Sequence, residues 1–180
     1  HRNAEFLVLP FTGKSALVVH DETDEPARPR GPDGDAETLM SLKGLRDMFE
    51  FTPGLRKQIA AKLLEDIPPE VAIDEGWKLL SNERPVRFKE MEYHVPIAAQ
   101  VEALREVVAA VERRVEVYFP IEVRFIAPET AWLSPFHGRA SCSIATHMRA
   151  TQDFKPVFGA VEPILRKHGG RPHWGKLHTL

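Results

Sequence analysis

Two long stretches of apolar residues at helical spacing alternate with strand-like segments, and this order restricts the possible folds more than any other feature. An apolar residue recurs every three or four positions at 97–115 and again at 154–165. Strand patterns surround these stretches at 91–95, 121–126, 142–148 and 176–179. The resulting order, β-α-β-β-α-β, is that of a ferredoxin-like domain, an antiparallel sheet with helices on one face. We therefore predict an α+β fold with this core at 81–180.

The first 80 residues add further elements before the core. Apolar runs on both sides of Gly13 predict an antiparallel hairpin within 1–20. Residues 21–36 are acidic and rich in proline and glycine, which indicates a solvated linker loop. Leucines at helical spacing then predict a helical segment at 37–80, with a break at Thr52-Pro53. With 180 residues, 43% of them hydrophobic, the chain is long enough for one core, and we expect a single domain.

Charge and cysteine content narrow the classes of partner and compartment. The formal net charge of -2 offers no basic surface for nucleic acid. Cys142 is the only cysteine, so an internal disulfide is excluded, and its strand-like surroundings predict an inert core residue. No apolar run approaches the roughly 20 residues of a membrane helix, so we expect a soluble, cytoplasmic chain without a transmembrane segment.

Two motifs that could suggest other chemistry do not have the required spacing. Gly13-Lys14-Ser15 resembles the end of a phosphate loop, but Val8 stands where that motif needs its first glycine. His168, His173 and His178 are evenly spaced, yet no cysteine or carboxylate accompanies them at metal-site spacing. We predict neither a nucleotide site of this type nor a metal site.

The segment 169–178 is dense in residues that fix the backbone or carry charge. Gly169-Gly170 can end a helix, and Pro172 fixes its own φ. Trp174 favours burial, so we expect the ammonium group of Lys176 to be held in place and to face an anion. The alternative is a surface lysine on an edge strand.

Charged and titratable side chains share faces of two predicted strands. Glu122 and Arg124 are two residues apart, so they leave the same face with Cα atoms roughly 6–7 Å apart and can act on one ligand. A solvated ion pair of little energetic value is the alternative. His147 and Arg149 share a face of the next strand. A histidine on such a face is more often structural than catalytic.

Several motifs occur in the order and spacing found in a known group of oxidases. They are 3–12 (NAEFLVLPFT), 91–96 (MEYHVP), 121–124 (IEVR), 131–135 (AWLSP), Gly138-Arg139 and 169–178 (GGRPHWGKLH). On these motifs the chain resembles the sugar-lactone and alditol oxidases, D-arabinono-1,4-lactone oxidase-like flavoenzymes of the vanillyl-alcohol oxidase superfamily. The resemblance covers nearly the whole chain and is weakest at 21–80. It implies the C-terminal cap or substrate domain of such an enzyme.

The resemblance also implies a reaction and a set of substrate contacts. An FAD-linked oxidoreductase of this kind oxidises a CH–OH group of a sugar lactone, alditol or related polyol by hydride transfer to flavin N5. Glu122 and Arg124 are expected to bind and polarise substrate hydroxyls, assisted by His147. Arg149 is a further candidate for substrate binding, at a position where some relatives have a smaller polar group.

Lys176 and His173 are the residues that the resemblance places at the cofactor. A fixed cation can stabilise the negative charge of a reduced flavin, and Lys176 is expected to do so with His173 beside it. FAD itself would be held mainly by an N-terminal domain that precedes His1, so this chain alone is expected to be inactive. The alternative is a non-catalytic ferredoxin-like module that binds a small ligand or a protein on its open sheet face.

Overall fold

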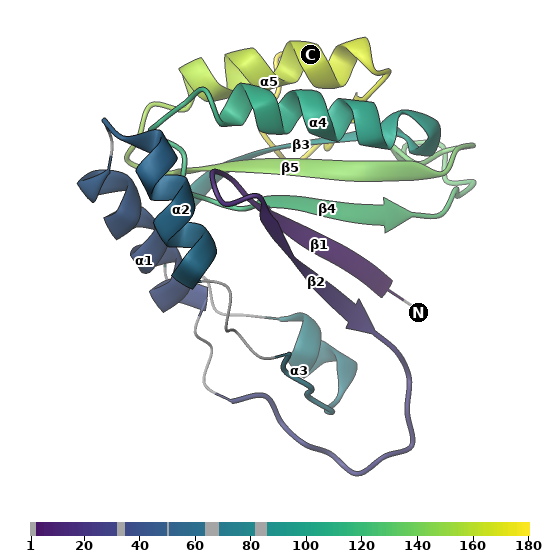
Figure 1. Cartoon of the computed structure of the whole chain (residues 1–180). Coiled ribbons are helices and arrows are strands. Elements are labelled where there is room, and N and C mark those ends of the chain that lie inside the picture. Colours follow the sequence, from purple (N-terminus) through teal and green to yellow (C-terminus); the bar gives the residue numbers. More distant parts are fainter. Residues whose placement is uncertain (1–2, 32–34, 50, 64–68, 82–85) are drawn as a thin grey trace.

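The chain folds around one six-stranded antiparallel sheet (Figure 1), which confirms the predicted α+β class. The computed structural model describes residues 3–31, 35–49, 51–63, 69–81 and 86–180. The strand order is β2-β1-β4-β5-β3-β6. The strands are β1 Asn3–Leu9, β2 Lys14–His20, β3 Phe88–Pro96, β4 Ile121–Ile126, β5 Ser141–Arg149 and β6 Arg171–Pro172.

The last four strands and two helices form the predicted ferredoxin-like core. Helix α4 (Gln100–Val111) follows β3 through a 3-10 turn at Ile97–Ala99, and α5 (Lys155–Lys167) follows β5. Both helices cover the same face of the sheet (Figure 1). The hairpin of β1 and β2 is bonded to the free side of β4 and widens the sheet beyond the core. The opposite face of the core strands therefore carries no helix of the β-α-β-β-α-β unit.

Alternation along the strands directs apolar side chains to the covered face. Met91, Tyr93 and Val95 of β3 are buried together with Ile121 and Val123 of β4. The helices contribute further buried residues to the same cluster: Ala103, Val107, Val111, Val157, Phe158, Val161 and Leu165. Cys142 also lies in this cluster, and burial raises the pKa of its thiol to about 11. It is therefore the core residue that its surroundings predicted.

Helix α4 is present as predicted, but its end and its buried face differ from the prediction. The helix ends at Val111, not near Val115. Its buried residues are Ala103, Val107, Ala110 and Val111. Of the predicted stripe, Val111 is thus buried, Leu104 and Val108 are partly buried against the core, and Val101 is 53% exposed. The 3-10 turn before the helix has about three residues per turn, which shifts the phase of the apolar stripe. Ala103 and Ala110, which the apolar pattern did not count, are among the buried residues.

Two glycines end helix α5 and direct the chain back along β3. Gly169 has a left-handed φ of 71°, and its amide donates to Arg166 O at 2.9 Å. The amide of Gly170 donates to Leu165 O at 2.8 Å. These two bonds form the Schellman arrangement. The predicted helix stop is confirmed.

The last strand lies five residues before its predicted position. Strand β6 pairs with β3 at Arg171 and Pro172, and residues 176–179 are not in a strand. A turn closed by the Lys176 amide and His173 O at 3.1 Å bends the chain after two paired residues. One further backbone bond, from Leu177 N to Glu90 O at 2.9 Å, still attaches the tail to β3.

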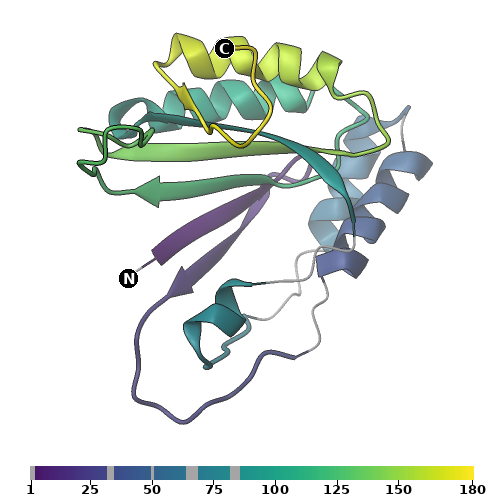
Figure 2. The same ribbon diagram turned by 180° about the vertical axis from the view of Figure 1, so that it is seen from behind.

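Helices α1 (Asp35–Met48) and α2 (Pro53–Leu63) confirm the two predicted helices before and after Thr52. Figure 2 shows them beside one end of the sheet. The buried guanidinium of Arg56 attaches α2 by donating to Val117 O at 2.7 Å. Of the predicted linker 21–36, residues 21–31 are loop, 32–34 lie outside the described residues, and α1 already includes 35 and 36. A short helix, α3 (Gly76–Leu80), follows.

Candidate active site

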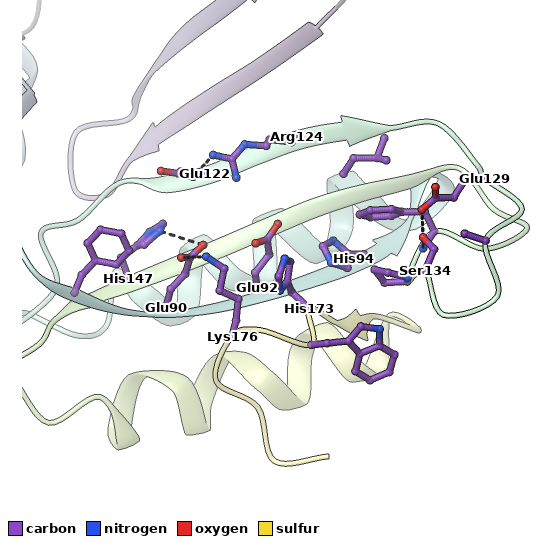
Figure 3. Close-up of a pocket in the computed structure, with 16 residues that line it drawn as sticks. Glu90, Glu92, His94, Glu122, Arg124, Glu129, Ser134, His147, His173 and Lys176 are labelled. Atoms are coloured by element: carbon purple, nitrogen blue, oxygen red, sulfur yellow. Dashed lines mark hydrogen bonds and ion pairs between the residues drawn. The ribbon is translucent and has the colours of Figure 1, made fainter. Parts of the chain in front are cut away.

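A cavity of about 700 Å³ lies on the sheet face opposite α4 and α5. Its floor comes from β3, β4 and β5, and its walls come from the loop at 127–140 and the tail at 173–176 (Figure 3). The lining contains four carboxylates and two cations: Glu90, Glu92, Glu122, Glu129, Arg124 and Lys176. The lining also contains three histidines and three aromatic side chains: His94, His147, His173, Phe88, Phe136 and Trp174.

The hollow exists because small side chains of the central strand lie between larger ones on its neighbours. In the register of the sheet, Ala145 of β5 lies between Glu92 of β3 and Glu122 of β4. In the next row on this face, Ser143 lies between His94 and Arg124. Successive residues of a strand point to opposite faces, so these rows all open on the side away from the helices. The polar groups of three strands thus surround a shallow depression over β5.

Lys176 and His147 meet the carboxylate of Glu90 at one end of the cavity. The Lys176 ammonium is hydrogen-bonded to Glu90 Oε2, and His147 Nε2 lies 3.6 Å from Glu90 Oε1. Burial alone would raise the pKa of Glu90, but the hydrogen bonds from His147 and Lys176 outweigh it and lower that pKa to about 2. Glu90 is therefore a carboxylate at neutral pH. It is the counter-ion of Lys176 in this structure.

The sequence suggested that a buried Trp174 holds Lys176 in place, but Trp174 is not buried. The Trp174 side chain is 63% exposed, and its Nε1 donates to Leu133 O at 2.9 Å. Backbone bonds hold the tail instead, from His173 N to Glu92 O at 3.0 Å and from Leu177 N to Glu90 O at 2.9 Å. Lys176 is thus fixed by strand β3, while the indole lies at the rim of the cavity.

Two arginines join the tail to the loop at 127–140. Arg139 donates to Gly169 O at 2.9 Å and to His94 O at 2.7 Å. Arg171 donates to Pro135 O at 3.1 Å and to His137 O at 2.9 Å. These bonds make the loop and the tail one continuous wall.

The Glu122–Arg124 pair forms as its spacing predicted, and a third residue joins it. Arg124 donates through its outer nitrogen to Glu122 and through Nε to Glu5 Oε2 at 2.6 Å. Charges on Glu122 and Glu5 raise the pKa of Arg124 although its burial acts in the opposite direction. A guanidinium has five N–H groups. Three of them remain for a ligand after these two bonds.

His94 is the most deeply buried polar group of the cavity, with 1% of its surface exposed. Burial, followed by the charges of His173 and Arg139, lowers the pKa of His94 to about 4. Its Nδ1 lies 3.0 Å from Ser143 Oγ, and Ser143 in turn donates to Glu92. His94 is therefore a neutral imidazole near neutral pH.

Five of the six residues selected from the sequence line this cavity, and the sixth does not. Glu122, Arg124, His147, His173 and Lys176 are brought together, although they come from three separate segments of the chain. Arg149, at the end of β5, lies opposite Phe88 and is not among the lining residues. It is two residues beyond His147 on the same strand face, which carries it past the end of the hollow.

Sequence reasoning did not select Glu90, Glu92 and His94 as site residues, although their signal was present. All three alternate in the sequence with Met91, Tyr93 and Val95, so a strand places them together on its opposite face. Two charged residues and a histidine on one strand face, next to a sheet face without helices, could have indicated a site. Glu5 carried no such signal because its role depends on the long-range pairing of β1 with β4.

Within the described residues, no helix is long and apolar enough to cross a membrane. Across the same parts of the chain, no cluster of three or more His, Cys, Asp or Glu side chains is arranged to hold a metal ion.

Comparison with known proteins relates the whole chain to one family of oxidases. The family model of D-arabinono-1,4-lactone oxidase matches residues 1–180. An L-gulono-1,4-lactone dehydrogenase of Mycobacterium tuberculosis is 34% identical over 184 residues, which cover 97% of this chain and 42% of that protein. This chain thus spans less than half the length of that relative.

Two other relatives match over about half of the chain. An alditol oxidase of a Streptomyces species is 37% identical over 93 residues, 49% of this chain and 21% of that protein. The L-gulonolactone oxidase of Mus musculus is 36% identical over 101 residues, 52% of this chain and 23% of that protein.

Proposed function

Because the chain belongs to the D-arabinono-1,4-lactone oxidase family, we propose that it forms the substrate-binding part of an FAD-dependent oxidoreductase. The proposed reaction is oxidation of a CH–OH group of a sugar lactone, an alditol or a related polyol. The observation that carries this proposal is the polar cavity on the open sheet face, where Glu122, Arg124, His147 and Lys176 come together.

The charges of the cavity favour a neutral polyhydroxylated substrate. Four glutamates against two cations give the lining an excess of negative charge when the histidines are left aside. Carboxylates only accept hydrogen bonds, so they suit the O–H donors of a polyol. A sugar acid or a sugar phosphate would instead be repelled by like charge. The proposed substrates are therefore lactones and alditols, not the corresponding acids.

Arg124 is the proposed donor to substrate oxygens. Glu5 and Glu122 fix its guanidinium from two sides, and three N–H groups remain free to donate. A donor group that is already oriented loses little conformational entropy when substrate binds. Glu122 would accept a hydroxyl hydrogen from the same substrate.

His147 is the proposed acceptor of the hydroxyl proton. Its Nδ1 lies 3.3 Å from the carbonyl oxygen of Pro120, which can only accept, so Nδ1 carries the hydrogen of the neutral ring. In the neutral ring the lone pair is then on Nε2, and Nε2 donates to the nearby Glu90 carboxylate only after it has gained a proton. Oxidation of CH–OH to C=O releases a hydride and a proton, and Nε2 can hold the proton.

The residues of the cavity fit a flavin, although the FAD would be held mainly by parts of the protein outside this chain. Lys176 is a cation fixed beside the cavity, and Trp174 offers an exposed ring at its rim. When bound, FAD accepts a hydride and gains negative charge. Lys176 is proposed to stabilise that charge from a position set in advance by Glu90, with His173 next to it in the wall.

A spectrum and a substrate panel test this function. The full-length protein that contains this chain is expected to show flavin absorbance and to oxidise neutral sugar lactones or alditols faster than aldonic acids of the same carbon number. A colourless protein that gains no flavin on reconstitution would contradict the proposal. That result would instead support a non-catalytic ligand- or protein-binding module.

A further inference from the structure

The hydrogen-bond partners of His94 determine which of its two ring nitrogens carries the hydrogen. Ser143 has one hydroxyl hydrogen and donates it to the Glu92 carboxylate. The hydroxyl oxygen can therefore only accept from His94 Nδ1, which lies 3.0 Å away. Because burial keeps the ring neutral, with its pKa lowered to about 4, the hydrogen is on Nδ1 and the lone pair is on Nε2.

The neighbouring histidine has the opposite arrangement. The backbone amide of Gly175 donates to His173 Nδ1 at 3.0 Å. A nitrogen that accepts a hydrogen bond carries no hydrogen, so the ring hydrogen of His173 is on Nε2. The ring centres of His94 and His173 lie 5.9 Å apart, and both rings line the cavity. One ring thus offers an acceptor and the other a donor at its Nε2 atom.

The acceptor of this pair has no hydrogen-bond partner in the part of the chain that the structure describes. His94 Nε2 is buried and makes no hydrogen bond. Its ring contacts the apolar ring of Phe136 edge-on, with 4.5 Å between the centres. An unpaired buried acceptor is unfavourable. The rings next to His94, those of Phe136 and His173, also line the cavity. The unpaired acceptor therefore belongs to a ring that itself lines the cavity.

We propose that His94 and His173 form a hydroxyl-recognition subsite, in which one substrate hydroxyl donates to His94 Nε2 and accepts from His173 Nε2. This inference rests on the proposed oxidation of a polyol. The His94 ring lies farther along the cavity than His173, which stands between it and the group formed by Glu90, His147 and the Lys176 ammonium (Figure 3). The recognised hydroxyl is therefore not the one that is oxidised, and the subsite selects a substrate with a second hydroxyl at a set distance along its carbon chain.

Deoxy analogues test the subsite in the full-length flavoprotein. Each analogue of the preferred lactone or alditol lacks one hydroxyl, and kcat/KM is measured for the wild type and for His94→Phe. One analogue with its oxidised carbon intact is expected to lose about tenfold or more with the wild type, as for the loss of one hydrogen bond. With His94→Phe, the parent substrate and this analogue are expected to react equally. His137→Gln, at an exposed position outside the cavity lining, is the control.

A second variant distinguishes loss of the subsite from a folding defect caused by substitution of the buried His94. His173 is only partly buried, and His173→Leu is expected to remove the same selectivity for the same hydroxyl. If neither variant changes the ratio between parent and any deoxy analogue, the subsite is refuted while the proposed oxidation stands. If the wild type oxidises no polyol at all, both proposals fall.

The tautomers can be measured without turnover. Nitrogen chemical shifts of the histidine-labelled full-length protein, assigned with the two variants, are expected to show His94 protonated on Nδ1 and His173 on Nε2. A hydrogen on Nε2 of His94 would overturn the proposal, because the acceptor would then not exist.

Discussion

The ammonium group of Lys176, near the carboxyl end of the chain, is ion-paired with the carboxylate of Glu90 on β3. The same carboxylate lies 3.6 Å from His147 Nε2. A single side chain therefore positions both the proposed electrostatic group and the proposed proton acceptor. The arrangement links the tail, the strand β3 and the strand β5.

Lys176→Met is expected to slow flavin reduction by the substrate about 100- to 1,000-fold in the full-length protein, the range for loss of one preorganised electrostatic group. Methionine keeps much of the length of the side chain and removes its charge. Stopped-flow absorbance measures the rate. Lys167→Met is the control, since Lys167 pairs with Glu106 on the exposed surface of α5 and α4. Reduction of Lys176→Met at the wild-type rate would reject the proposed role.

Glu90→Gln is expected to lower stability at neutral pH and to have little effect in strong acid. The folded pKa of Glu90, about 2, lies below the ordinary value of 4.5. Its stabilising contribution is therefore complete above pH 4.5 and is lost as the pH falls toward 2. The shift corresponds to about 3 kcal/mol at most.

Thermal unfolding of the wild type and of Glu90→Gln between pH 2 and pH 7 tests this difference. Glu102→Gln, on the exposed side of α4, controls for the loss of one negative charge. A gap between wild type and Glu90→Gln that stays constant down to pH 2 would show that the ion pair does not set the pKa.

The local part of this fold was predictable, because strand alternation and helical spacing depend on neighbouring residues alone. The polar face of β3, the Glu122–Arg124 pair and the helix stop at Gly169 all follow from such patterns. What could not be read is the register between strands. Only that register brings Glu5 to Arg124 and sets Ala145 between Glu92 and Glu122, so the hollow itself has no signal in the sequence.

The turn at 173–176 explains two further differences between the structure and the prediction from sequence. Trp174 favours burial in general, yet the turn at 173–176 places it at the rim, where its Nε1 finds the carbonyl of Leu133. The predicted strand at 176–179 is interrupted by the same turn. In both cases the turn takes precedence over the preference of single side chains.

Arg124 lines the cavity and Arg149 does not, so substituting each of them tests where the cavity lies. Arg124→Lys is expected to lower kcat/KM about 10- to 100-fold, because a lysine cannot contact two carboxylates and still donate in a fixed direction. Arg149→Lys is expected to leave the KM for substrate unchanged, since Arg149 does not line the cavity. Steady-state kinetics of both variants decide the question. An increase of KM for Arg149→Lys would restore the substrate contact expected from the sequence.

Gly170→Ala is expected to destabilise the protein by about 1–3 kcal/mol, as overpacking does, and to reduce activity. A methyl group at this position would lie 2.6 Å from Leu165 O and 3.2 Å from Cδ1 of Tyr93. The carbonyl belongs to the end of α5, and the Tyr93 ring is fully buried, so neither can give way without moving the helix end or β3. Since β6 and the tail follow directly, the shift should also disturb the position of Lys176.

Gly159→Ala is the matched control for Gly170→Ala within the same segment of chain. Gly159 lies inside α5, and a methyl group there would meet no heavy atom within 4 Å. Alanine in a helix is favoured over glycine by about 0.5–1 kcal/mol, so this variant should unfold at a slightly higher temperature than the wild type. Equal melting temperatures for the two variants would mean that α5 and β3 do not approach each other at Gly170 as closely as described, and the path of the tail toward Glu90 would then need another explanation.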